Sequence, residues 1–265
     1  MAHTLQERYS NLVLAKLRQE NVFANLFNRK YEGSPKAGAV KIPVRDTEAT
    51  VGTYSTATGK VLTVGATTYQ TLNINEDIAV NEIVDGYEAS AVPDGLIADR
   101  LDSAGYALAL SIDTALATLL TTSGNYTAAT STATDEYELV VDAITQAKKA
   151  KVNKASMWIV ASADFIANLE KNTNFIHASA GGDDVIRNGF AGKINGVPVY
   201  ESLSTVVDSY KFILGNSDFC HFVNEFSVPV TVKDLTNEYI GSSAVQGRMV
   251  YGCKVSRPTT VILQA

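Results

Sequence analysis

Histidine is the side chain best suited to acid–base and metal chemistry near neutral pH, and the chain has three of them, His3, His177 and His221. None forms an H-x-x-x-H or H-E-x-x-H pair, the spacing at which two histidines on one helix face share a zinc ion. No G-x-S-x-G elbow is present. A triad assembled from distant positions is the remaining catalytic alternative. We therefore predict no catalytic, cofactor-binding or metal-binding residues, and no cofactor.

One glycine-rich stretch, residues 189–194, partly matches a phosphate-binding loop. Such a loop opens with a glycine and ends with serine or threonine after its lysine, so that backbone amides and a hydroxyl meet the phosphates. Here position 187 is Arg and position 194 is Ile. The stretch is interpreted instead as a turn before a strand at 197–200.

Acidic residues cluster before and within a long apolar segment: Glu76, Asp77, Glu82, Asp85, Glu88, Asp94, Asp99 and Asp102. Their spacing lacks the D-x-D-x-D-G pattern of a calcium loop, so a solvated or partner-facing acidic surface is favoured. The first 45 residues are basic, with eight Lys or Arg and three Glu, while the whole chain has a net charge of −6. This contrast leaves two alternatives, a basic arm that lies on acidic surface, perhaps a neighbour's, or a solvated basic tail.

Composition limits the classes of protein. The net charge of −6 disfavours a dedicated nucleic-acid binder, and the 19% of charged residues is low, as in subunits that bury surface against neighbours. Cys220 and Cys253 form no C-x-x-C pair, which favours assembly in a reducing compartment. The start of the chain has no apolar leader, so no secretory signal is expected. The apolar run at 104–120 is short and interrupted, so no membrane span is expected.

The elements that would position these residues are mixed. Residues 1–27 have rough helical spacing, and 39–75 are rich in β-branched residues with a turn at 57–60, which predicts two long strands in a hairpin. Apolar residues recur at steps of three and four over 96–120, which predicts a long helix with Asp94 as N-cap and an end near Ser123 and Gly124. Further helices are predicted at 137–150 and 164–171, and strands at 157–161, 197–200, 211–214, 228–232, 250–256 and 259–263. Without regular βαβ units, the class is α+β.

The order of a basic arm, a long hairpin, a long helix and a mixed body resembles the major capsid proteins of tailed bacteriophages, with the Hong Kong 97-like shell fold. The similar stretches are residues 28–33 (N-R-K-Y-E-G) with 38–43 (G-A-V-K-I-P), 83–113, 158–169, 192–200 (G-K-I-N-G-V-P-V-Y) and 210–217. Each is short, and together they cover nearly the whole chain in the family's order.

The resemblance implies four regions: an N-terminal arm at 1–36, an E-loop β-hairpin at 37–76, the spine-helix part of the P-domain at 77–122, and an A-domain with returning P-domain strands at 123–265. It implies a structural subunit, not an enzyme, that assembles with itself as pentamers and hexamers into an icosahedral shell around double-stranded phage DNA. The arm and E-loop would lie over neighbouring subunits. The location would be the virion, and the host cytoplasm during assembly.

Further partners follow from the same resemblance: portal and decoration proteins, weak contact with packaged DNA, and a separate scaffolding protein or none, since the arm begins almost at Met1. Lys60, near the hairpin tip, is the one candidate for cross-linking to a neighbour, although an ordinary turn lysine is favoured. Two alternatives stay open. One is an encapsulin-like shell that packages protein cargo, and the other is an α+β enzyme or small-ligand binder.

Overall fold

The computed structural model describes residues 18–19, 21–31, 38–44, 49–60, 67–87, 96–172, 190–236 and 239–265. The helices and helical turns are α1 (Phe23–Leu26), α3 (Leu96–Thr121), α4 (Glu136–Lys149), η1 (Lys154–Ser156), α5 (Ala163–Glu170), α7 (Thr205–Asp208) and η2 (Pro258–Thr260). The strands are β1 (Ala39–Val44), β2 (Thr68–Asn73), β3 (Glu76–Val84), β4 (Thr127–Ala128), β5 (Met157–Ser162), β6 (Phe190–Ile194), β7 (Val197–Ser202), β8 (Phe212–Asn216), β9 (Cys220–Asp234), β10 (Ser243–Val255) and β11 (Ile262–Gln264). The mixture confirms the α+β prediction.

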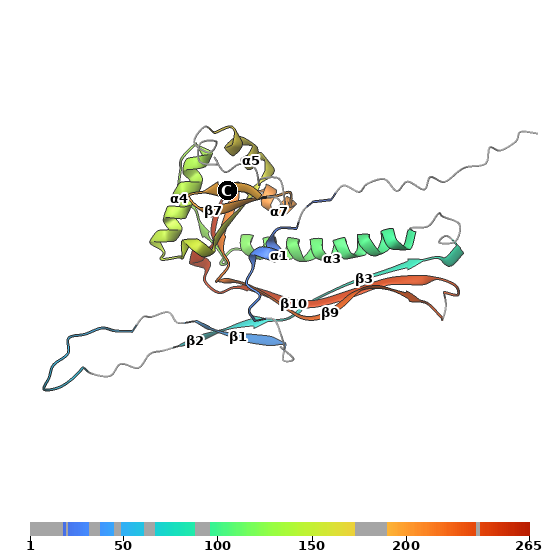
Figure 1. The fold of residues 1–265 in the computed structure, drawn as a ribbon, viewed down its shortest axis with the longest axis horizontal. Helices are drawn as coiled ribbons and strands as arrows, with labels where there is room; N and C mark the ends of the chain where they lie inside the picture. Colours follow the sequence, from blue (N-terminus) through green and yellow to red (C-terminus); the bar gives the residue numbers. More distant parts are fainter. Residues whose placement is uncertain are drawn as a thin grey trace, which may run out of the picture.

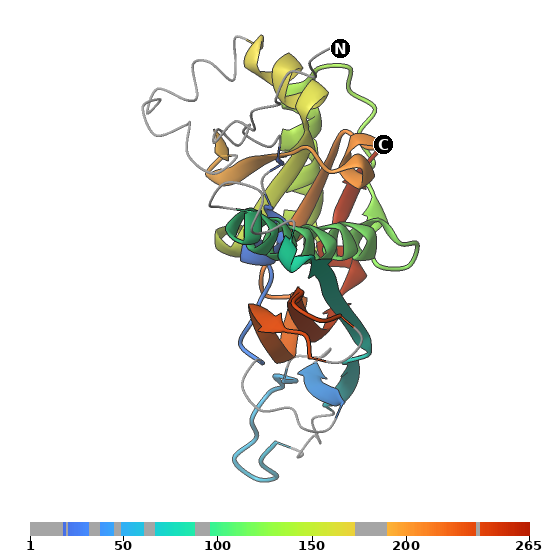
Figure 2. The ribbon, with the colours of Figure 1, turned by 90° about the vertical axis from the view of Figure 1, so that its right-hand side faces the viewer.

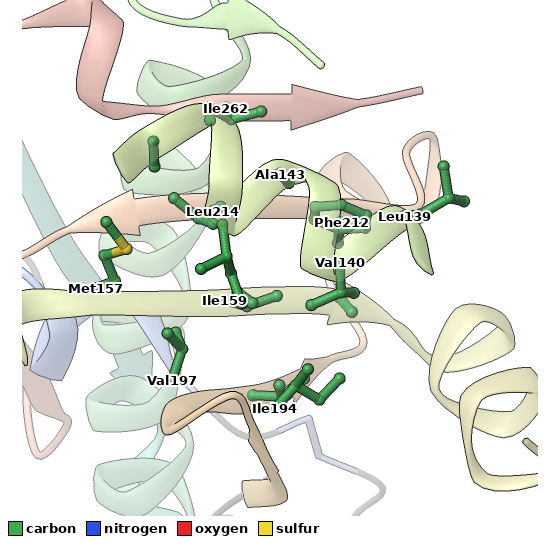
Figure 3. Close-up of a cluster of buried hydrophobic side chains, with 14 of the residues drawn as sticks. Leu139, Val140, Ala143, Met157, Ile159, Ile194, Val197, Phe212, Leu214 and Ile262 are labelled. Atoms are coloured by element: carbon green, nitrogen blue, oxygen red, sulfur yellow. The ribbon is translucent and has the colours of Figure 1, made fainter. Parts of the chain in front are cut away.

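The body of the molecule is a mixed sheet of order β4-β11-β8-β5-β7-β6, which carries a hydrophobic core on each face. Along the central strand β5, Met157, Ile159 and Ala161 point into the core under α4 and α5, as Figure 3 shows for part of this core. Trp158 and Val160 point into the core on the other face, with α1 and α3. A strand with a core on both faces has apolar residues at consecutive positions, as residues 157–161 do. The strand predicted there is confirmed.

A second, elongated unit joins α3 to a three-stranded antiparallel sheet of order β3-β10-β9. In Figure 1, α3 runs along this sheet and away from the body. Ala104, Leu108 and Ile112 are buried on the helix, and Ala104 packs with Val84 and Val245 of the sheet. The predicted helix at 96–120 is confirmed, but its N-cap at Asp94 lies outside the described residues.

The hairpin predicted at 39–75 is present but shorter than expected. Strands β1 and β2 pair antiparallel from Ala39 opposite Asn73 to Val44 opposite Thr68. Ile42, Val44, Leu72 and Ile74 pack with Val223 of β9 and form the core under the hairpin base. Over 49–60 the structure has a single bridge between Ser55 and Gly59 around the predicted turn. Threonine, glycine and serine fill that stretch, so few side chains are apolar enough to hold two strands together.

Several other expectations need correction. Only Phe23–Leu26 is helical within the described part of residues 1–27. The acidic stretch at 76–84 forms strand β3, which was not predicted. Strands β9 and β10 are longer than predicted, and η2 occupies part of the strand predicted at 259–263. Phe190–Ile194 is strand β6, not a turn; the turn follows at Asn195 and Gly196, where φ is positive at both residues.

Helix α3 is longer than the apolar run at 104–120, whose short length was one reason to expect no membrane span. Over Ile97–Thr121 it is long and apolar enough to cross a membrane. Core helices of globular proteins pass the same test, and α3 has core contacts of this kind, since Leu116, Ala117 and Leu120 are fully buried between the helix and the body. Length and hydropathy alone therefore do not assign α3 to a bilayer.

Candidate assembly interface

The N-terminal arm is anchored on the chain's own long helix. The Asp113 carboxylate accepts a 2.8 Å hydrogen bond from the backbone amide of Phe23, at the start of α1. Asp113 is fully buried, and burial raises the pKa of its carboxyl to about 6, although the amides of Phe23, Ala24 and Val22 act in the opposite direction. Phe23 also meets the Trp158 ring edge-on, at 6.2 Å between ring centroids. The anchor thus combines a buried carboxylate with aromatic packing.

A second contact joins the basic arm to the acidic cluster. The Arg18 guanidinium lies 2.6 Å from the Asp102 carboxylate and stacks 4.8 Å from the centre of the Tyr106 ring. The Tyr106 hydroxyl exchanges hydrogen bonds with the backbone of Gln19. Charge complementarity between arm and acidic surface, one of two alternatives from the sequence, is therefore present here within one chain.

Other members of the acidic cluster also have partners within the chain. Glu82 on β3 pairs with Arg100 of α3 at 2.7 Å, and Asp77 on β3 pairs with Arg248 of β10 at 2.5 Å. These pairs connect β3 to its neighbours, and the side chains of Glu82 and Asp77 stay 39% and 46% exposed, so this part of the cluster lies at the surface. Glu88 and Asp94 lie outside the described residues.

A junction of three segments surrounds His221. The arm reaches β9 through hydrogen bonds from the Asn28 amide to the Cys220 carbonyl, at 2.8 Å, and from the Phe222 amide to the Asn28 carbonyl, at 3.0 Å. The Tyr31 ring stands edge-on against the imidazole, at 5.3 Å between centroids. His221 is buried, and its burial lowers the pKa of the imidazole to about 4. The other two histidines, His3 and His177, lie outside the described residues.

The outer part of the hairpin, residues 49–60, extends away from the body in both views (Figures 1 and 2). Its apolar side chains Val51 and Tyr54 are 93% and 72% exposed. Lys60 contacts the carbonyl oxygen of Thr50 across the hairpin. A protruding loop with exposed apolar side chains is the form expected of a segment that is buried against another chain.

A second exposed apolar patch lies at the far end of the three-stranded sheet. It consists of Ile83, Tyr87, Tyr239 and Ile240, and Ile240 is 90% exposed. Gly86 and Gly241 meet there so closely that a Cβ on Gly86 would lie 1.8 Å from the Gly241 carbonyl oxygen. The tip therefore brings the two glycine backbones into close contact, with exposed apolar side chains beside them.

Two grooves follow α3. One, with a volume of about 400 Å³, lies between α1, α3 and β9, and Asn21 and Asn224 each have a buried amide oxygen there without a hydrogen-bond partner among the described residues. The other, of about 700 Å³, lies between α3, at Thr114 and Thr118, and the strand residues Glu76 and Cys253. Within the described part of the chain, no three His, Cys, Asp or Glu side chains are grouped as metal ligands would be. The described residues therefore offer open grooves and exposed apolar side chains.

Comparisons with known proteins agree with this geometry. A family model described as "Phage capsid protein" matches residues 88–263. A solved structure from Mycobacterium phage Che8 is 26% identical, with a TM-score of 0.78 over 98% of this chain and 96% of that one. The capsid structure of the cyanophage P-SCSP1u is 15% identical, with a TM-score of 0.74 over 97% and 91% of the two chains. The mature capsid of bacteriophage PhiM1 is 14% identical, with a TM-score of 0.67 over 98% and 91%. No curated protein matches the chain.

The family model covers more than half of the chain, and the structural similarity extends over nearly all of it. The fold is the Hong Kong 97-like fold that the sequence resembles, and the role is structural, as a component of the virion capsid. The chain belongs to the phage capsid protein family, as a major capsid protein of the tailed-phage type.

Proposed function

We propose that this capsid protein assembles as pentamers and hexamers into a closed icosahedral shell that encloses double-stranded DNA. Assembly takes place in the host cytoplasm, with a separate scaffolding protein or none and with portal and decoration proteins as later partners. The chain acts mechanically, since many weak contacts between identical subunits together stabilise one container. It needs no catalytic residue for this role.

The observation that carries the proposal is the protruding hairpin. Val51 and Tyr54 are 93% and 72% exposed on a segment that leaves the body, and the core at the hairpin base ends at β1 and β2. Leaving such side chains in water gains no hydrophobic stabilisation, whereas burial against a second chain does. We propose that the E-loop, residues 37–76, lies over a neighbouring subunit and that the arm, residues 1–36, continues from α1 toward another.

The other two regions of the chain have separate structural roles in the same proposal. The spine-helix region, residues 77–122, gives a stiff strut, and residues 123–265 give the A-domain and the returning strands β9 and β10. The lengths of α3 and of the paired strands β9 and β10 support this division, since both extend well beyond the body in Figure 1.

The test is assembly of hairpin variants. Val51→Asp with Tyr54→Asp places two charges on the exposed loop, whereas the matched control, Val51→Thr with Tyr54→Phe, keeps size and neutrality. We expect the charged variant to fold with an unchanged melting temperature and to fail to form particles by size-exclusion chromatography and negative-stain electron microscopy. The control should assemble. Normal particles from the charged variant would rule out a buried hairpin.

A second measurement separates DNA packaging from protein cargo. Particles from infected cells should contain double-stranded DNA that resists nuclease until the shell is opened. Particles that contain a defined protein in place of DNA would support the encapsulin-like alternative.

A further inference from the structure

We propose that His221 is an acid-sensitive lock on the N-terminal arm: protonation of its imidazole releases residues 28–31 from β9, while residues 22–27 stay bound to α3. The proposal concerns the single subunit, and it stands whatever the size or contents of the shell. It rests on the contacts around one buried side chain.

The lock lies where several chain segments meet. His221 is 2% exposed and forms a bridge with Asn28 of the arm, on the opposite side of β9 from its pairing with β10. Its Nε2 lies 3.1 Å from the Ser256 hydroxyl, just after β10, and the Ser256 carbonyl accepts a 2.9 Å hydrogen bond from Gln70 of the hairpin. Arm, hairpin base and sheet therefore share this histidine.

The hydrogen bonds fit an imidazole that carries its proton on Nε2. The Ser256 hydroxyl donates to the Phe219 carbonyl at 3.1 Å, so its oxygen can accept a hydrogen bond from the Nε2–H of His221. The other ring nitrogen, Nδ1, is buried and has no hydrogen-bond partner among the described residues. A proton added at Nδ1 would place a buried charge and an unsatisfied N–H in the junction, and both are costly.

The charged and titratable groups around the ring offset little of this cost. Lys254 of β10 pairs directly with His221, and its ammonium donates to the Thr71 carbonyl of the hairpin, so a cation is already present on that side. The arm contributes Tyr31, and β9 contributes Cys220, whose thiol stays protonated because burial raises its pKa to about 12. Asp218, before β9, is the one group that favours the charged ring, and it acts less strongly than burial.

The two anchors of the arm respond to acid in opposite directions. The folded-state pKa of His221 is lowered from 6.5 to about 4, so acid favours the open form, in which water can reach the ring. Burial raises the pKa of Asp113 from 3.8 to about 6, so acid removes a buried charge at the contact with α1 and does not add one. Opening is therefore confined to the segment beside β9. The equilibrium for that opening should rise by at most about tenfold per pH unit below 6.5.

Hydrogen–deuterium exchange of the full-length protein tests the lock, with protection factors corrected for the intrinsic pH dependence of exchange. Between pH 7 and pH 5 we expect peptides covering 28–31 and 220–222 to lose at least tenfold in protection, while the peptide covering 23–26 keeps its own. Equal protection of 28–31 at both pH values would overturn the proposal. So would parallel loss across the whole arm.

Variants assign the effect to one side chain. His221→Gln should abolish the loss of protection, because it keeps a neutral donor for Ser256 and cannot titrate. The matched control, His3→Gln with His177→Gln, removes the other two histidines and should respond to acid like the natural protein. If His221→Gln does not fold, this control still decides the matter: a response that disappears with His3 and His177 would refute the role of His221.

Discussion

The Asp113 side chain, near the middle of α3, accepts a hydrogen bond from the backbone amide of Phe23, ninety residues earlier in the chain. A buried carboxylate needs hydrogen-bond donors around it. Here the Phe23 amide donates to Oδ1, while Oδ2 has no hydrogen-bond partner among the described residues. The contact fixes where the N-terminal arm leaves the body.

Asp113→Ala should destabilise the subunit by about 1–3 kcal/mol, because it leaves the buried Phe23 amide without an acceptor. Asp113→Asn keeps an acceptor of the same shape and should cost clearly less. Urea unfolding monitored by Trp158 fluorescence measures both, since this is the only tryptophan and it packs on Phe23. Equal destabilisation by Ala and Asn would mean that charge, and not the hydrogen bond, holds the arm.

The pH dependence of stability should change sign between two variants. Asp113 contributes stability that is present below pH 3.8 and is lost as the pH rises through about 6. His221 contributes stability that is present above pH 6.5 and is lost as the pH falls through about 4. Each effect reaches about 3 kcal/mol, and in the natural protein they largely cancel.

Asp113→Asn should therefore make the subunit less stable at pH 4.5 than at pH 7, and His221→Gln should make it more stable at pH 4.5 than at pH 7. The midpoint of urea unfolding at the two pH values measures this difference. Two variants with the same trend would contradict the opposite assignments.

Gly215 of β8 lies against the indole of Trp158, and a Cβ there would be 2.3 Å from ring carbon Cζ2. Gly215→Ala should therefore destabilise the subunit by roughly 1–3 kcal/mol or more, since a packed core cannot absorb the added methyl group. Gly105→Ala is the matched control, because nothing lies within 4 Å of its Cβ position on α3. It should stabilise the protein by about 0.5–1 kcal/mol. Thermal unfolding distinguishes the two variants, and equal effects would show that Trp158 moves easily.

Local patterns in the sequence predict the elements whose contacts are close along the chain. Helix α4 follows from its periodic apolar face and from Asp135, whose side chain accepts from the amides of Tyr137 and Glu138. The sequence does not predict strand β3, although Ile78, Val80 and Val84 alternate along it, because the acidic residues between them are typical of a surface segment. Its partner β10 lies far away in the sequence. The ion pair between Arg248 of β10 and Asp77 of β3 forms only when the two strands pair.

The functional contacts were harder to predict for the same reason. Asp113 interrupts an apolar run, and nothing near it in the sequence points to Phe23. His221 has no informative neighbour in the sequence. Its surroundings come from two distant segments, the arm with Asn28 and Tyr31 and the residue after β10, Ser256. The resemblance to capsid proteins predicted an arm and a hairpin, but not the side chains that fix their bases.

The two cysteines should be unreactive in the folded subunit. Burial raises the pKa of the Cys220 thiol to about 12 and that of the Cys253 thiol to about 11, so at pH 8 little of either is the reactive thiolate. Because Cys253 is only partly buried, it should react first with iodoacetamide, about a hundredfold more slowly than an unfolded cysteine, and Cys220 should react later still. Mass spectrometry of native and urea-unfolded protein measures both rates. Rapid labelling of Cys220 at pH 8 would show that the strand pairing around Cys220 opens readily, since its carbonyl accepts the hydrogen bond from Asn28 of the arm.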